Sequence, residues 1–397
     1  MNKTELLFLN LLKQSIFSKN EYPKSILSSE DVKNMINISF QHICQGYIFK
    51  ALFMNNAEIP TEFNIYTKQL IYRNYNYLSV QEEILEKLRE NNVKCVILKG
   101  CSVSMNYNDP MYRILGDIDI LVDESDYERA IHIFLDGKPH DPQKDKHEFH
   151  YGLEYKGYTI EIHKYVTIYS SENSNLKNVL TNILDDIQTG KLDIYKFPVL
   201  NNKYQAICLL LHLKRHLLRN NTNLRMLIDY LVFADKISYS EWNDNIYPEL
   251  KILDLDTLAD LLFELSDKFF GTNNTLKIKN KTNQHYVDEL MDEIIESGVT
   301  DSSEKLANTF GTPENNSGKN SKFKVIFNTL NNLSVKNFKI AKYKIMLPVC
   351  WCMIVFRYFF RVLFKKRANI TLKQIGQSID RKNELYEILK IRKSGDQ

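Results

Sequence analysis

The chain has little glycine and proline, with 13 and 9 residues among 397. Because these residues dominate turns, their scarcity argues against an all-β design of many short strands and favours long helices. Long hydrophobic runs are also lacking. The longest apolar stretch, Ile345–Phe356, has twelve residues, whereas a membrane-spanning helix needs about 20. We therefore expect no transmembrane segment.

Paired cysteine motifs are missing as well. Six cysteines are scattered along the chain, none of them in a C-x-x-C arrangement, and no signal peptide is recognisable at the N-terminus. This pattern predicts reduced thiols that pack as small buried hydrophobes, and a cytoplasmic location.

Acidic residues are absent between Glu314 and Asp380, a segment with thirteen lysines and arginines. The net charge of +3 therefore combines an acidic body with a basic C-terminal region. Residues 315–379 have three interpretations: a structural region, a peripheral contact with anionic membrane, or a clamp on nucleic acid. Within them, Ile345–Phe356 is interpreted either as a buried core helix or as an interfacial helix.

Hydrophobic patterning predicts an α+β protein in which helical regions flank a small mixed sheet. Residues 1–91 are an N-terminal helical cap with helices at 6–16, 29–54 and 61–91, and Ser28 or Ser29 as an N-cap. Residues 92–170 contain strands 93–98 and 115–122, helices 100–107 and 125–135, and a hairpin of 147–155 with 158–165 that turns at Lys156 and Gly157. This part is the predicted core.

The remaining chain is predicted to be helical. Residues 171–299 form a substrate-side region with helices at 176–189, 203–218, 223–236 and 242–270. Residues 300–321 are a linker, and 322–397 are a basic helical C-terminal region.

Two carboxylates, Asp117 and Asp119, lie inside the apolar run Gly116–Val122. Alternation along a strand points both to one face and the isoleucines to a core. Taken alone, the pair is either the solvated side of an edge strand or a divalent cation site for phosphate chemistry.

A third carboxylate, Glu161, is flanked by isoleucines in the same way as Asp119. Burying it without a partner would be costly, so we predict that it is the third ligand of Mg²⁺ or Mn²⁺. His163 would share its face. This histidine either orients Glu161, touches substrate, or is structural.

The predicted nucleotide-binding residues are Lys99, Gly100, Ser102, Arg113 and Gly116. Gly100 follows a strand at a turn into a helix, where a phosphate can approach the backbone and free N–H groups. Ser102 would add a donor, and the basic side chains of Lys99 and Arg113 suit phosphate. The alternative role for these cations is a salt bridge to Asp109 or Asp117.

Substrate-side residues are predicted at His163, His216, Arg225 and Asp229. His212 and His216 have a spacing that binds zinc, but no third ligand is apparent. Arg225 and Asp229 are four residues apart and are expected to form an intrahelical or interhelical pair that fixes a substrate-facing helix beside the sheet.

The residues Leu98–Gly100, Tyr107, Arg113, Gly116–Val122 and Glu161–His163 resemble the signature of a bacterial family of uncharacterised nucleotidyltransferases. That family is placed in the DNA polymerase β-like nucleotidyltransferase superfamily. The resemblance is strongest from Val93 to Tyr165, so it identifies residues 92–170 as a nucleotidyltransferase-like catalytic core.

The resemblance implies metal-dependent transfer of a nucleoside monophosphate from an NTP, ATP included, with pyrophosphate leaving. Asp117 and Asp119 would bind both metals and Glu161 the catalytic one. The chain departs from the superfamily pattern in the late position of the Asp pair, in Cys101 after Gly100, and in Glu161 where Asp is frequent. These departures affect the phosphate-binding residues more than the metal ligands.

The acceptor is not identified by the resemblance, and small molecules, sugars, peptides and proteins all remain. Two alternatives belong to other functional classes. One is a catalytically silent nucleotide-binding or scaffold protein, and the other is a nucleic-acid-modifying transferase that uses the basic C-terminal region.

Overall fold

The computed structural model describes residues 1–17, 26–135, 150–166, 174–218, 221–272 and 274–298, with short pieces after residue 330. The chain forms two compact units. The first comprises Met1–His212 with Leu224–Thr282, and the second comprises Leu213–Asn223 with Asn283–Gln397. All strands of the described residues, and all three predicted carboxylate ligands, belong to the first unit.

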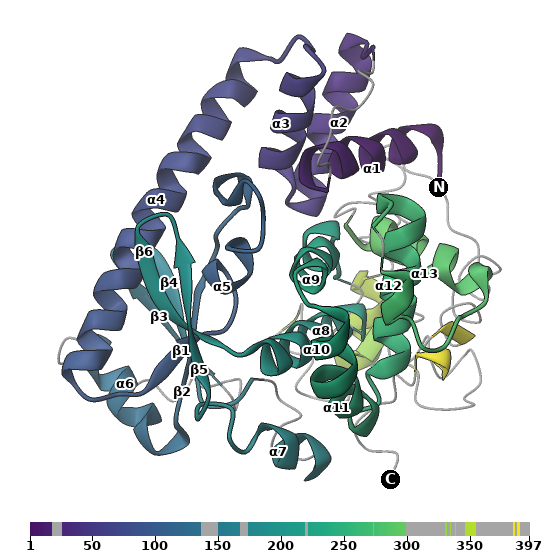
Figure 1. The fold of residues 1–397 in the computed structure, drawn as a ribbon. Coiled ribbons are helices and arrows are strands. Elements are labelled where there is room, and N and C mark those ends of the chain that lie inside the picture. Colours follow the sequence, from purple (N-terminus) through teal and green to yellow (C-terminus); the bar gives the residue numbers. More distant parts are fainter. Residues whose placement is uncertain are drawn as a thin grey trace. The chain divides into compact units, whose positions relative to one another are not determined.

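The first unit is α+β and contains a six-stranded mixed sheet of order β3-β4-β2-β1-β6-β5 (Figure 1). The strands are β1 (Cys95–Ile97), β2 (Ile118–Val122), β3 (His150–Tyr155), β4 (Tyr158–His163), β5 (Ile187–Leu192) and β6 (Tyr195–Leu200). β2 is antiparallel to β1 and parallel to β4, while β1 is parallel to β6. Two antiparallel hairpins, β3–β4 and β5–β6, complete the two edges.

The β5–β6 hairpin corrects the sequence interpretation, which predicted a helix over 176–189. Helix α7 ends at Leu180, and the chain re-enters the sheet at Ile187. The hairpin is stabilised by tertiary pairing, because its strand β6 pairs with β1 and buries Phe197 and Val199. Strand β5 buries only Gly190 and Leu192, so a single buried side chain gives little local signal for this pairing.

Helices α1 (Lys3–Ile16), α2 (Ser29–His42), α3 (Gln45–Met54) and α4 (Thr61–Glu90) precede the sheet. Ser28 is the N-cap of α2, where it forms a capping box with Asp31. The predicted continuous helix over 29–54 is wrong, because Ile43 adopts a left-handed conformation with φ 57° and ends α2. Helix α4 runs along the sheet in Figure 1. Its side chains Tyr77 and Ile84 are completely buried in the hydrophobic core that α4 shares with the sheet.

The helices that follow α4, up to residue 298, are all shorter than α4. They are α5 (Cys101–Ser104), α6 (Tyr127–Phe134), α7 (Ser174–Leu180), α8 (Asn202–Leu218), α9 (Leu224–Asp235), α10 (Tyr239–Glu241), α11 (Tyr247–Ile252), α12 (Asp256–Phe270) and α13 (Gln284–Gly298). The helix predicted over 242–270 is interrupted near Asp254, where φ is 52°. Among the described residues, no helix combines the length and the apolar character needed to cross a bilayer.

The C-terminal predictions fall mostly outside the described residues, including the linker 300–321 and most of 315–379. Residues 347–354 are helical, and there Cys350 is buried while Val349 and Met353 are exposed. This described part is therefore not a fully buried core helix. Burial is confirmed for five of the six free cysteines and is wrong for Cys352.

Candidate metal and nucleotide site

Three carboxylates converge at the neighbouring strands β2 and β4. Asp119 of β2 pairs in parallel register with Glu161 of β4, and Asp117 directly precedes β2. Neighbours in register point to the same face, and the ligand oxygens of all three lie within 4.8 Å of one another. Asp119 is buried, Glu161 is half-buried and Asp117 is exposed. The structure thus brings together the three acidic residues named from the sequence.

Helix α4 fixes the loop that leads into β2. Asn74 Nδ2 donates to the carbonyl oxygens of Met111 and Arg113, both at 2.8 Å, and Asn74 Oδ1 accepts from Leu115 N at 3.3 Å. Tyr77 Oη donates to the Asp117 carbonyl oxygen at 3.1 Å. Because Asn74 and Tyr77 are buried, these bonds hold Asp117 in place next to the strand.

Lys99 reaches the same site from the end of β1. Leu98 N donates to the Asp119 carbonyl oxygen at 3.0 Å, and Lys99 Nζ lies 2.8 Å from Asp119 Oδ1. Gly100 follows with φ 63°, and a Cβ atom there would lie 2.7 Å from Tyr77 Oη. Only glycine meets both demands without strain.

Two histidines extend the cluster on β3 and β4. His163 Nε2 lies 3.0 Å from Asp119 Oδ1 and 3.3 Å from Glu161 Oε2. His150 Nε2 lies 3.7 Å from Glu161 Oε1, and His150 pairs with His163 across the hairpin. The side chain of His163 is only 4% exposed, so its contacts with the carboxylates are shielded from water.

The ionisable side chains of the site shift one another's pKa values. Burial opposes ionisation of Asp119, but Lys99 and the His163 hydrogen bond hold its pKa well below the usual value. The Asp119 charge, and then burial, raise the pKa of Asp117. Burial disfavours a charged His163, yet its bonds to Asp119 and Glu161 raise its pKa. Burial is the largest influence on Glu161 and opposes its ionisation, but the hydrogen bond from His163, together with the charges of His150 and His163, lowers the pKa of that carboxyl.

The donor set of Asp117, Asp119 and Glu161 fits Mg²⁺ or Mn²⁺. Both ions bind hard carboxylate oxygens and complete their shells with water and substrate phosphates. Three carboxylates face the ammonium group of Lys99, so the site favours the entry of further positive charge.

Arg113 has a different partner from those predicted. Its Nε and Nη2 atoms each lie 2.7 Å from an oxygen of Asp229, and Tyr107 Oη donates to Asp229 Oδ1 at 2.7 Å. The predicted Arg225–Asp229 pair and the alternative partners of Arg113 are therefore wrong. The planar guanidinium of Arg113 matches the carboxylate in a bidentate geometry, which takes precedence over the four-residue spacing of Arg225.

Arg225 instead approaches the Ile114 carbonyl oxygen at 3.5 Å, at the limit of a hydrogen bond. The other predicted partner of Arg113, Asp109, is bound by Lys50. The pair of Arg113 and Asp229 therefore ties α9 to the loop before β2.

The other predicted residues contribute unequally to this geometry. Ser102 is fully buried, and its hydroxyl donates to the Leu98 carbonyl oxygen at 3.0 Å. Gly116 is exposed beside Asp117. The helix after Gly100 is a single turn rather than the predicted 100–107, so it adds little dipole for phosphate. His216 belongs to the second unit, where Nδ1 lies 2.8 Å from Asn221 Oδ1.

Sequence reasoning missed Asn74, Tyr77 and His150. Asn74 and Tyr77 are signalled only by their places on the buried face of α4. His150 had a readable signal, because the predicted turn at Lys156 and Gly157 sets the hairpin register and places His150 opposite His163.

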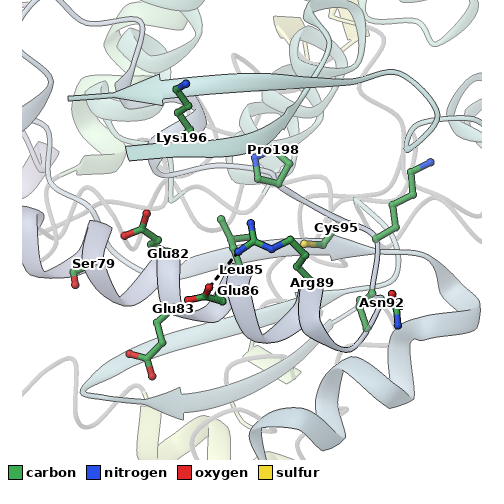
Figure 2. Close-up of a pocket in the computed structure, with 12 residues that line it drawn as sticks. Ser79, Glu82, Glu83, Leu85, Glu86, Arg89, Asn92, Cys95, Lys196 and Pro198 are labelled. Atoms are coloured by element: carbon green, nitrogen blue, oxygen red, sulfur yellow. Dashed lines mark hydrogen bonds and ion pairs between the residues drawn. The ribbon is translucent and has the colours of Figure 1, made fainter. Parts of the chain in front are cut away.

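A separate open cavity of about 740 Å³ lies between α4 and β6, as Figure 2 shows. Its lining includes Glu82, Arg89, Cys95 and Lys196. Cys95 pairs with Val122, at the opposite end of β2 from the Asp117 end, so this cavity is not the carboxylate site.

Comparison with known proteins is consistent with this geometry. A family model described as uncharacterised nucleotidyltransferase matches residues 28–271, a range that includes all three carboxylates, Lys99 and both histidines. Neither the curated proteins nor the solved structures contain a match. Since the model covers more than half of the sequence, the chain belongs to this family of uncharacterised nucleotidyltransferases.

Proposed function

We propose that the chain moves a nucleoside monophosphate from an NTP to an acceptor hydroxyl and releases pyrophosphate. Divalent ions, Mg²⁺ or Mn²⁺, would be held by Asp117, Asp119 and Glu161. The observation that carries the proposal is the register of Asp119 with Glu161, beside Asp117, in a member of a nucleotidyltransferase family. The same arrangement supports a place in the DNA polymerase β-like superfamily.

Bound divalent ions would neutralise the triphosphate and activate the acceptor oxygen. That oxygen gives up its proton to solvent and forms a bond to the α-phosphorus, while the bond from this phosphorus to pyrophosphate breaks. The chain's own part is positioning. Lys99 holds an ammonium beside Asp119, at the edge where the phosphates would bind, and Gly100 leaves the backbone open to them.

Arg113 and Ser102 have supporting roles in this proposal. Asp229 accepts hydrogen bonds from the Nε and Nη2 atoms of Arg113, and the Ser102 hydroxyl donates to the Leu98 carbonyl oxygen. Phosphate contacts are therefore assigned to Lys99, Gly100 and Gly116, and His163 acts by orienting Asp119 and Glu161.

The test is transfer of label from each α-labelled NTP, with Mg²⁺ or Mn²⁺, to protein, RNA or metabolites of a lysate. The variant Asp117→Asn with Asp119→Asn should lose transfer, because the remaining carboxylate cannot hold two ions. Asp193→Asn is the matched control. Asp193 is exposed at the β5–β6 turn with φ 55°, a conformation that asparagine tolerates.

Transfer that survives the double substitution would refute the mechanism. Labelled RNA would instead identify the acceptor class of a nucleic-acid-modifying enzyme. NTP binding without consumption, in every lysate fraction, would support the catalytically silent protein.

A further inference from the structure

The face of the sheet that carries the carboxylates also carries two imidazoles. Asp119 pairs with Glu161, and His150 pairs with His163, which lies two residues beyond Glu161 on β4. Residues two apart on a strand, and residues paired across strands, project from the same face. The hairpin therefore adds nitrogen donors directly beside the oxygen donors.

The geometry of these donors resembles a coordination shell. One nitrogen or oxygen ligand atom of each of His150, Glu161 and His163 lies within 4.8 Å of those of the other two. His163 Nε2 is 3.3 Å from one oxygen of Glu161, and His150 Nε2 is 3.7 Å from the other. Ligand atoms that share an ion at about 2.1 Å are separated by roughly 3.0–3.4 Å. An ion bound by these atoms would draw them to that separation, and it would replace the hydrogen bonds of His163 Nε2 with Asp119 and Glu161.

The geometry points to a second cation position, in which His150, Glu161 and His163 bind a divalent first-row transition ion such as Mn²⁺ or Zn²⁺. This inference rests on the proposed function, because Glu161 is shared with the carboxylate site. The two sets of ligands meet at that residue, so one ion would lie against Asp117 and Asp119 and the other against the imidazoles.

Ligand chemistry separates the two positions. Mg²⁺ binds oxygen and dehydrates reluctantly, whereas imidazole favours transition ions, and two histidines with one carboxylate are a common set for them. The carboxylate position therefore accepts Mg²⁺, and the histidine position discriminates against it. A mixed pair of ions follows, with the transition ion beside Glu161.

The inference is tested by Mn²⁺ binding to the metal-free full-length chain without nucleotide, followed by electron paramagnetic resonance of free Mn²⁺ in excess Mg²⁺. We expect one Mn²⁺ to resist Mg²⁺, and His150→Ala to weaken this binding at least tenfold. Co²⁺ provides a second readout, since nitrogen ligation gives visible absorption bands that His150→Ala should diminish. His163→Gln should act in the same direction.

The matched control is His285→Ala. His285 is exposed and contacts a carboxylate oxygen of Glu289 at 3.3 Å, so its loss removes a histidine–carboxylate pair elsewhere. Wild-type Mn²⁺ retention by His150→Ala, or displacement of all Mn²⁺ by Mg²⁺, would overturn the inference. His150 lies on an edge strand, so this variant remains informative if His163→Gln fails to fold.

The inference and the proposed function fail in different ways. Histidine-dependent Mn²⁺ binding without any NTP turnover would support the second cation position and would refute the proposed transferase activity. Mg²⁺-dependent transfer with Mn²⁺ binding unaffected by His150→Ala would do the reverse.

Discussion

Replacing Asp229 by asparagine removes the charge that balances Arg113 inside the first unit. The two side chains are 5% and 10% exposed and make two contacts of 2.7 Å. Unit charges at that distance attract by about 6 kcal/mol at an effective dielectric constant of ~20, and desolvation offsets much of this. Breaking such a pair from one side costs about 3–5 kcal/mol, because the other charge stays buried.

Arg225 increases the cost of that substitution. Burial, and then the charge of Arg113, already lower the pKa of Arg225. Without Asp229 the two guanidinium groups would repel each other unscreened. We expect Arg113→Met combined with Asp229→Asn to be less destabilising than Asp229→Asn alone, since the uncompensated charge is gone and Tyr107 keeps an oxygen acceptor.

The assay is urea unfolding followed by fluorescence of Trp242, which is fully buried in the first unit. The chain has two tryptophans, so a Trp351→Phe background makes Trp242 the sole reporter. Glu86→Gln is the control, because the Arg89–Glu86 pair is 76% and 56% exposed, and its loss should cost less than about 0.5 kcal/mol. A loss below about 1 kcal/mol for Asp229→Asn, or a double variant less stable than the single one, would refute the reasoning.

Two further predictions concern the glycine turn and a buried histidine. In a thermal melt, Gly100→Ala should lower stability by about 1–3 kcal/mol, since φ is 63° and Tyr77 Oη is 2.7 Å from the added atom. The control Gly116→Ala should be nearly neutral, because its added atom has no neighbour within 4 Å. Equal losses for the two variants would contradict this explanation. His42 is fully buried, and burial lowers its pKa from 6.5 to about 4. The unfolded chain therefore binds the extra proton between these values, so stability should fall by up to about 3 kcal/mol as pH drops from 6.5 to 4. His42→Asn, which retains an acceptor for Leu224 N, should flatten this pH dependence, and an unchanged slope would refute the assignment.

The sequence was informative where local patterns and local structure agree. The apolar, acidic, apolar pattern around Asp119 and Glu161 locates two strands, and the Lys156–Gly157 turn fixes a hairpin. The N-cap at Ser28 was equally predictable from the sequence. These features depend on neighbours within a few residues, which periodicity and turn chemistry describe well.

The remaining features depend on contacts between distant segments. Arg113 and Asp229 are more than a hundred residues apart in the sequence. No spacing rule selects Arg113 over Arg225 as the partner of Asp229. Strand β6 is stabilised by parallel pairing to β1, which local propensity does not report. Ile43 ends α2 with a β-branched residue at positive φ, against its own preference.

The parallel pairing of β1 with β6 also affects how the chain is made. During synthesis β1 and β2 emerge early, but the partner on the other side of β1 arrives only with Tyr195–Leu200. Until then the nascent chain exposes an unsatisfied backbone edge lined by Cys95, Val96 and Ile97, all buried in the finished fold. Such an edge recruits strands from other chains. Expression of a fragment that stops before residue 195 therefore favours inclusion bodies over folded protein.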